Sequence, residues 1–184
     1  MHRLLVAAVL CLFAFPAMAT EAGWALLREG GNIVLMRHAY AHGTMDPPNF
    51  DIERCGTQRN LSDRGRQQAR RIGSLFAARA APVERVYSSR LCRALDTARL
   101  AFGERYVEAF PALDPPPADE EAAAEARAAV FAVVNEYEGS GNIVLMTDLA
   151  VIEALTGRPA REGEALIVTP TEDGLHVLAR VVFN

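Results

Sequence analysis

The pentapeptide Asn-Ile-Val-Leu-Met occurs twice in this chain, at 32–36 and at 142–146, each time directly behind a glycine. Both copies are continuous apolar runs, which is typical of strands that are covered on both faces. Such strands belong to a parallel sheet that lies between layers of helices. The repeat therefore favours an α/β fold in which two similar strands end at the same edge of one sheet.

The remaining pattern alternates strands and helices. Further strands are expected at 83–87, 165–169 and 175–183, and helices at 63–79, 91–102, 119–137 and 149–156. Ser62 is a natural N-cap for the first helix, and Gly157 closes the last. A proline-rich loop covers 111–117, and nothing indicates a domain boundary. We predict a single three-layer domain with a mostly parallel sheet flanked by helices.

The first nineteen residues have the features of a secretory signal peptide. A basic start at Arg3 precedes an apolar run of about a dozen residues, and Ala17 and Ala19 supply the small side chains that signal peptidase requires. The run is shorter than the roughly 20 residues of a membrane span, which disfavours an N-terminal anchor. We expect cleavage after Ala19, a domain of residues 20–184 and a periplasmic location.

Charge and cysteine content limit the function further. The chain has 19 basic and 23 acidic residues, a formal net charge of −4, which argues against nucleic-acid binding. Removal of Cys11 with the leader would leave Cys55 and Cys92. In an oxidising compartment this pair is a disulfide candidate, with two buried thiols as the alternative.

Polar residues follow the strands where ligands bind in a parallel sheet, at the carboxyl ends. Arg37 and His38 follow the first strand, Asp148 follows the second copy of the pentapeptide, and Arg93 opens the helix after a third strand. Guanidinium groups match phosphate oxygens, and an imidazole held among such donors can attack phosphorus. An isolated Arg-His pair would be read as a surface loop, but the combination predicts a phosphate-transfer site.

Three blocks of sequence carry a family resemblance. Residues 35–39 (LMRHA) and 61–69 (LSDRGRQQA) resemble the paired signature of the histidine phosphatase (phosphoglycerate mutase-like) superfamily. Residues 87–98 (YSSRLCRALDTA) resemble its third block, and the blocks follow the family's order and spacing between about 31 and 170. Segments 44–50 and 55–60 are similar to an exported bacterial branch.

The resemblance implies a function and its residues. Arg37 and Arg93 would clamp the phosphate, His38 would be the nucleophile, and Thr44 would add a hydroxyl ligand. The implied activity is metal-independent phosphomonoester hydrolysis through a phosphohistidine, without a cofactor. The substrate would be a small phosphorylated molecule, with an envelope sugar phosphate suggested by the compartment.

Nearby polar residues carry weaker interpretations. Arg59 and Arg90 are spare candidates for phosphate binding, but solvated or paired surface residues are the favoured interpretation. His38, His42 and Asp46 could be read as metal ligands, but no helix is expected there to place them on one face, so a loop is favoured and no metal is expected.

Asp148 departs from the family pattern, which has a phosphate-facing histidine at this position. An ionised carboxylate cannot donate a hydrogen bond and repels a phosphate by roughly 3 kcal/mol per unit charge at ~5 Å and a dielectric of ~20. It could also pair with Arg37 or Arg93. We therefore expect weak activity at neutral pH, with a catalytically impaired module that binds a phosphate ester or a partner as the alternative.

The expected position of the proton donor also departs from the family pattern. The family's catalytic acid usually lies in the stretch that is proline-rich here, at 113–117. Asp114 is the obvious substitute, although the interpretation as a simple turn aspartate is favoured. A protonated Asp148 is the other possible acid, because burial or neighbouring carboxylates raise a carboxyl pKa.

Overall fold

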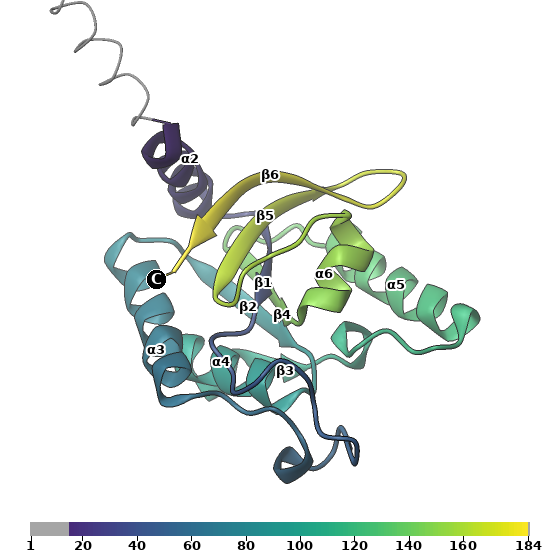
Figure 1. Cartoon of the computed structure of the whole chain (residues 1–184). Coiled ribbons are helices and arrows are strands. Elements are labelled where there is room, and N and C mark those ends of the chain that lie inside the picture. The colour runs from purple at the N-terminus through teal and green to yellow at the C-terminus, as the bar shows by residue number, and fades with distance from the viewer. Residues whose placement is uncertain (1–14, 184) are drawn as a thin grey trace, which may run out of the picture.

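The computed structural model describes residues 15–183, with side chains described from residue 20 onward (Figure 1). The expected signal peptide lies largely outside the described residues, so cleavage after Ala19 stays a prediction. No helix in the described part of the chain is both long and apolar enough to cross a membrane.

One six-stranded sheet forms the centre of the molecule, with the strand order β3-β2-β4-β1-β5-β6. Strands β1 to β4 run parallel, and β5 and β6 join the β1 edge in antiparallel orientation. The strands are β1 Ile33–Arg37, β2 Val83–Ser88, β3 Val107–Ala109, β4 Asn142–Thr147, β5 Glu164–Pro170 and β6 Leu175–Val182. The predicted mostly parallel sheet is confirmed, and only the short edge strand β3 was not expected.

The two copies of the repeated pentapeptide lie side by side in this sheet. Strand β1 pairs with β4 in parallel, and the register aligns Ile33 with Ile143 and continues to Arg37 beside Thr147. The glycines before the copies also meet, since the Gly31 N–H donates to the Gly141 carbonyl at 2.7 Å. The residues that follow each copy are therefore delivered to neighbouring positions at one edge of the sheet.

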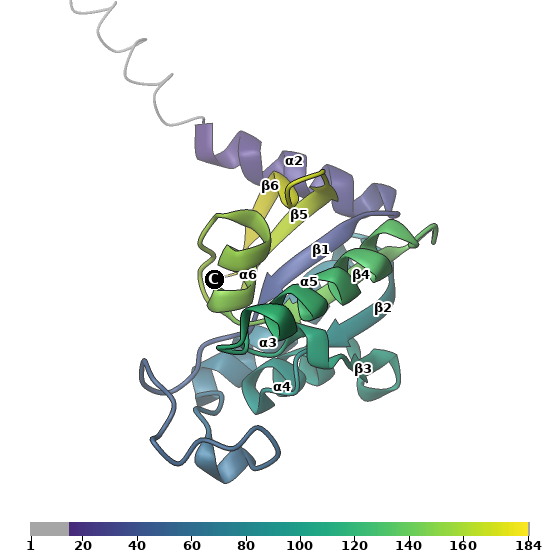
Figure 2. The same ribbon diagram turned by 90° about the vertical axis from the view of Figure 1, so that its right-hand side faces the viewer.

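Helices cover both faces of the sheet (Figures 1 and 2). They are α2 Phe15–Glu29, α3 Asp63–Ala78, α4 Cys92–Phe102, α5 Glu120–Asn135 and α6 Leu149–Thr156. Helices α2, α3 and α4 share one core with the strands, and α5 and α6 share the other. Strand β1 serves both cores because successive side chains point to opposite faces, with Val34 and Met36 in the first and Ile33 and Leu35 in the second.

Helix α2 was not predicted. Trp24 and Leu27, one helical turn apart, are buried in the first core, and the Trp24 ring packs edge-on against Phe76 and Phe183. The helix contacts β6, so the segment just after the expected cleavage site is an integral part of the domain. The i, i+3 spacing of these two apolar residues was the available sequence signal.

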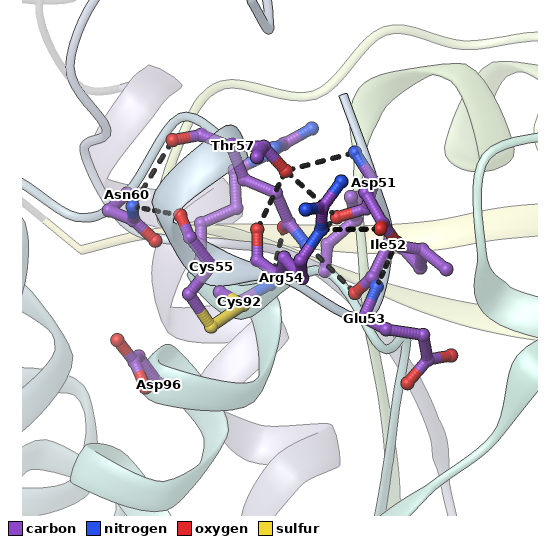
Figure 3. Close-up of a disulfide and its surroundings, with 12 residues drawn as sticks. Asp51, Ile52, Glu53, Arg54, Cys55, Thr57, Asn60, Cys92 and Asp96 are labelled. Carbon is purple, nitrogen blue, oxygen red and sulfur yellow. Dashed lines mark hydrogen bonds and ion pairs between the residues drawn. A yellow bond between two sulfur atoms is a disulfide. The ribbon is translucent and has the colours of Figure 1, made fainter. Parts of the chain in front are cut away.

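A disulfide between Cys55 and Cys92 ties the loop after β1 to the start of α4 (Figure 3). Cys55 opens a short 3₁₀ helix, Cys55–Thr57, in that loop. The loop is folded on itself, because the Thr57 hydroxyl accepts from the Asp51 N–H at 3.0 Å and donates to the Arg54 carbonyl at 2.8 Å. The alternative of two free thiols does not describe this structure.

Candidate active site

His38 is held rigidly at the end of β1. Its backbone N–H donates to the Thr147 carbonyl at 3.0 Å, so the strand pairing continues through it. Its Nδ1 lies 2.6 Å from the Ala39 carbonyl, which can only accept a hydrogen bond. The proton of a neutral imidazole therefore sits on Nδ1, and the Nε2 lone pair is left for chemistry. Nε2 is buried and has no hydrogen-bond partner within the described residues.

Neighbouring backbone contacts fix the position of this histidine. The Thr97 hydroxyl on α4 accepts from the Ala39 N–H at 3.0 Å and donates to the Arg93 carbonyl at 2.6 Å. Helix α3 approaches the chain so closely that a Cβ at Gly65 would lie 1.9 Å from the Tyr40 carbonyl oxygen. The N-cap Ser62 accepts from the Gly65 N–H at 3.0 Å, as the sequence predicts. The glycine in the second signature block thus allows α3 to pack against the segment that follows His38.

Arg93 is almost fully buried and is bound by two carboxylates. Its Nε donates to Asp148 Oδ2 at 3.0 Å, its Nη2 contacts the same oxygen, and its Nη1 donates to Asp46 Oδ1 at 3.0 Å. Asp148 Oδ2 also lies 3.7 Å from His38 Nε2, too far for a hydrogen bond, and the two form an ion pair only when the imidazole is protonated. The carboxylate thus occupies the place between the imidazole and the guanidinium.

Asp148 remains ionised in this setting. Burial raises the pKa of its carboxyl, but His38 and then Arg93 stabilise the charged form more strongly and hold the pKa well below its usual range. The other carboxylate oxygen accepts from the Leu149 N–H, so Asp148 is also the N-cap of α6. A lowered pKa argues against the interpretation of Asp148 as a protonated catalytic acid.

Arg37 has unused donors. Its Nη1 donates to the Ala160 carbonyl at 2.8 Å, its Nη2 lies 4.0 Å from Glu162 Oε1, and its Nε is buried without a partner within the described residues. Burial lowers the pKa of the guanidinium, while Asp148 and Glu162 act in the opposite direction. Arg59 and Arg93 lower it further, which shows that three guanidiniums lie within electrostatic reach of one another.

Arg59 is the third guanidinium of the site, and its side chain is only 7% exposed. Its Nη1 donates to the Gly43 carbonyl at 2.6 Å, and its Nη2 lies 3.6 Å from Glu162 Oε1. Its backbone N–H donates at 2.7 Å to the Asp46 carboxylate that also binds Arg93. Three arginines and three carboxylates thus alternate around the site, which we call the charge ring: Arg93, Asp46, Arg59, Glu162, Arg37 and Asp148.

The charge ring borders a cleft of about 350 Å³, within the size range of small-molecule sites. The lining residues are Arg37, Thr44, Asp46, Arg59, Arg93, Pro115, Asp148, Leu149, Ala150 and Glu153. His38 is fully buried and does not line the cleft, whereas its neighbour Asp148 does. A larger hollow of about 490 Å³ between α6 and the β5–β6 turn holds none of the predicted site residues.

Residues 33–114 match the sequence profile of the histidine phosphatase superfamily (branch 1). The chain is therefore similar in this segment to the histidine phosphatase superfamily. No curated protein matches this chain in sequence.

Solved structures of several phosphatases share the fold along nearly their whole length. An α-ribazole phosphatase from Shigella flexneri superposes with a TM-score of 0.58 at 18% identity and covers 83% of this chain and 96% of its own. The protein histidine phosphatase SixA, complexed with tungstate, gives 0.56 at 18% identity, covering 82% and 96%. A mycobacterial glucosyl-3-phosphoglycerate phosphatase with VO₃ gives 0.57 at 19% identity, covering 80% and 97%.

The predicted phosphatase residues meet around one site, with the exception of Asp114. Arg37, Thr44, Arg93 and Asp148 line the cleft, and His38 lies beneath Asp148. Asp114 accepts from the Ser89 hydroxyl at 2.9 Å, from the Arg90 N–H at 2.7 Å and from the Arg90 Nε at 2.6 Å. Asp114 therefore stabilises the turn between β2 and α4, which agrees with its interpretation as a turn aspartate.

The sequence reasoning missed other members of the site. Arg59 was expected on the surface but is buried in the cleft wall, whereas Arg90 lies outside the cleft and pairs with Asp114 and Glu53. Asp46 and Glu162 were not expected in the charge ring. No group of three metal-ligating side chains occurs among residues 15–183, and His42 is exposed.

Proposed function

We propose that this protein hydrolyses phosphomonoesters through a phosphohistidine on His38, and that Asp148 keeps the reaction slow at neutral pH. Phosphatase activity in general is supported by the family profile and by structural neighbours that are named as phosphatases. The neighbours' names also support a small phosphorylated substrate.

The observation that carries the proposal is the state of His38 Nε2. The Nδ1 contact with the Ala39 carbonyl makes Nε2 the free nitrogen of a neutral imidazole, and the Asp148 carboxylate 3.7 Å from Nε2 also binds Arg93. In the proposed reaction the Nε2 lone pair attacks phosphorus, the bond to the ester oxygen breaks, and Arg37 and Arg93 stabilise the charge on the equatorial oxygens. Water then cleaves the N–P bond and releases phosphate.

Asp148 hinders this reaction in two ways. It neutralises Arg93, the guanidinium that should bind phosphate, and it stands between the cleft and Nε2. A substrate phosphate must therefore displace a carboxylate that the lowered pKa keeps charged. Neither proposed acid is suited to protonate the leaving group, because Asp114 already accepts three hydrogen bonds and Asp148 is ionised.

The same contact favours a second candidate function. If Asp148 is not displaced in turnover, the cleft can still bind a phosphate ester through Arg37 and Arg59, and the protein is then a binding module without catalysis. The two functions differ in whether phosphate becomes covalently attached to His38.

A trapping experiment separates these functions. The purified protein is incubated with a ³²P-labelled aryl phosphate, quenched and tested for protein-bound phosphate that is labile in acid and stable in base, the behaviour of a phosphoramidate. We expect such label on the wild type and none on His38→Ala. His176→Ala, which removes an exposed histidine on β6, is the matched control and should label normally. Absence of label and of released phosphate from the wild type would leave the binding module as the function.

The proposed chemistry uses neither a metal nor an organic cofactor. Hydrolysis should therefore continue after dialysis against EDTA. Loss of activity on chelation, with recovery on adding back a divalent cation, would contradict the mechanism.

We also propose that the protein is exported to the periplasm and acts there on an envelope sugar phosphate. The support is the leader-like sequence of residues 1–19, together with a disulfide that suits an oxidising compartment. N-terminal sequencing of the protein from a periplasmic fraction tests the export proposal, with Thr20 expected as the first residue. Recovery of an intact Met1 from the membrane fraction would refute it.

A further inference from the structure

The charge ring contains one more guanidinium than a single transferred phosphate needs. Arg37 and Arg93 line the cleft and are the two guanidiniums that the proposed mechanism uses. Arg59 comes from the loop before α3, and its side chain bonds to the Gly43 carbonyl and faces Glu162 rather than His38 or Asp148. It is nevertheless almost fully buried and lines the same cleft. A buried arginine that lines a ligand-sized cleft can donate its remaining N–H groups to an anionic ligand.

The hydrogen bonds of the ring show where a ligand could find free donors. Arg93 directs its Nε and both terminal nitrogens to the carboxylates of Asp148 and Asp46. Arg59, in contrast, uses only Nη1 in side-chain hydrogen bonds among the described residues, out of the five N–H donors of a guanidinium. Arg37 has a buried Nε without a partner in the described part of the chain. Unused donors are therefore concentrated at Arg37 and Arg59.

The Glu162 carboxylate faces both of these arginines but is hydrogen-bonded to neither. Its Oε1 lies 3.6 Å from Arg59 Nη2 and 4.0 Å from Arg37 Nη2, beyond hydrogen-bond distance in each case. The cleft is also lined by Glu153, an exposed carboxylate on α6. An anionic group that enters the cleft is therefore attracted toward Arg59 and repelled from α6.

We propose that Arg59 binds a second anionic group of the substrate, a phosphate or a carboxylate, beside the phosphate that is transferred to His38. The preferred substrates are then small phosphomonoesters that carry two anionic groups. This inference rests on the proposed function for the first phosphate, but the site for the second anion can be tested by binding alone.

Calorimetric titration of the intact protein with orthophosphate, pyrophosphate and tripolyphosphate compares the affinities for anions with one and with several phosphate groups. We expect the longer anions to bind at least about tenfold more tightly than orthophosphate. Arg59→Gln should reduce this ratio to about two or less, and Arg59→Lys should retain part of it. Glu162→Gln should increase the ratio, because it removes the carboxylate that competes for Arg59. Arg90→Gln is the matched control, since Arg90 lies outside the cleft, and it should keep the wild-type ratio.

The outcomes separate this proposal from the catalytic one. A wild-type ratio near one, or an equal loss of affinity for all three anions in Arg59→Gln, would overturn the second-anion site. If Arg59→Gln does not fold, as judged by thermal melting, the Arg59→Lys and Glu162→Gln ratios decide the matter. The same titrations in His38→Ala should give the wild-type ratio of affinities although turnover is lost. The second-anion site can therefore be tested even if the phosphatase proposal fails.

Discussion

Strands β1 and β4 share five residues of sequence, lie side by side in register, and then diverge completely. Beyond β1 the chain continues through His38 into a long irregular segment that the Cys55–Cys92 disulfide ties to α4. Beyond β4 it passes Asp148 and enters helix α6 at once, with Asp148 as the N-cap. The first end supplies His38, the proposed nucleophile, and the second supplies the Asp148 carboxylate, whose Oδ2 lies 3.7 Å from His38 Nε2.

The difference shows that strand sequence and site chemistry are separate properties of this fold. The identical pentapeptides determine register and burial, which bring the two strand ends together. The chemistry depends on the next one or two residues. The Asp148 carboxylate after β4 is expected to hinder the phosphate transfer proposed for His38 after β1. The predictions below alter one end at a time, and they are ordered from the largest expected effect to the smallest.

The largest effect is expected from removing the disulfide that anchors the β1 side. The bond closes a loop across a sequence separation of 37, for which the chain-entropy relation gives about 3–4 kcal/mol. The double variant Cys55→Ala/Cys92→Ala should therefore lose about that much unfolding free energy in urea titrations. The wild type in a reducing buffer should show a similar loss. A loss below about 1 kcal/mol in both would mean that the loop is held by its hydrogen bonds alone.

Restoring a histidine at the β4 end should produce the next largest effect. Asp148→His removes the charge that neutralises Arg93 and supplies a donor, so kcat/KM on an aryl phosphate should rise about tenfold or more, equivalent to about 1.4 kcal/mol. Asp148→Asn removes the charge but keeps a good N-cap for α6, so it should recover part of the gain. If wild type is fast at pH 7 and both variants are slower, Asp148 takes part in catalysis and the damaged-site interpretation is wrong.

The sequence was sufficient for most of the fold, without α2 and β3, and for the His38 side of the site. Continuous apolar runs and the spacing of the three blocks predicted the strands, the main helices and the meeting of His38 with Arg93. The sequence could not predict the charge ring, because Asp46, Arg59 and Glu162 come from loops without periodicity. Their contacts depend on how each loop folds, and a polar residue in a loop usually faces solvent. Asp114 shows the converse, since a plausible acid is used to hold a turn.

The leaving group should reveal whether an acid operates. With Asp114 fully hydrogen-bonded and Asp148 ionised, the departing oxygen receives no proton from either, so rates should depend strongly on leaving-group pKa. We expect a series of substituted aryl phosphates to give a steep decrease in kcat/KM with rising leaving-group pKa. Asp148→His should make the dependence shallower, because a histidine at this position can donate a proton. A flat dependence in the wild type would indicate a proton donor that the structure does not assign.

The smallest effect concerns stability in acid and tests the ionisation of Asp148 directly. Because His38 and Arg93 lower the pKa of this carboxyl in the folded state despite its burial, its charge stabilises the fold above the unfolded-state pKa of about 3.9. That contribution is lost as the pH falls below about 4 toward the folded-state pKa, and a tenfold difference in proton affinity between the folded and unfolded states corresponds to about 1.4 kcal/mol. The unfolding free energy of the wild type should therefore fall more steeply than that of Asp148→Asn between pH 4 and pH 2.5. Asp173→Asn, which removes an exposed carboxyl on the β5–β6 turn, serves as the control and should follow the wild type. Urea titrations across this pH range measure all three proteins. If wild type and Asp148→Asn instead run parallel between pH 4 and pH 2.5, the carboxyl is not held ionised by His38 and Arg93, and Asp148 is again a candidate proton donor at the β4 end.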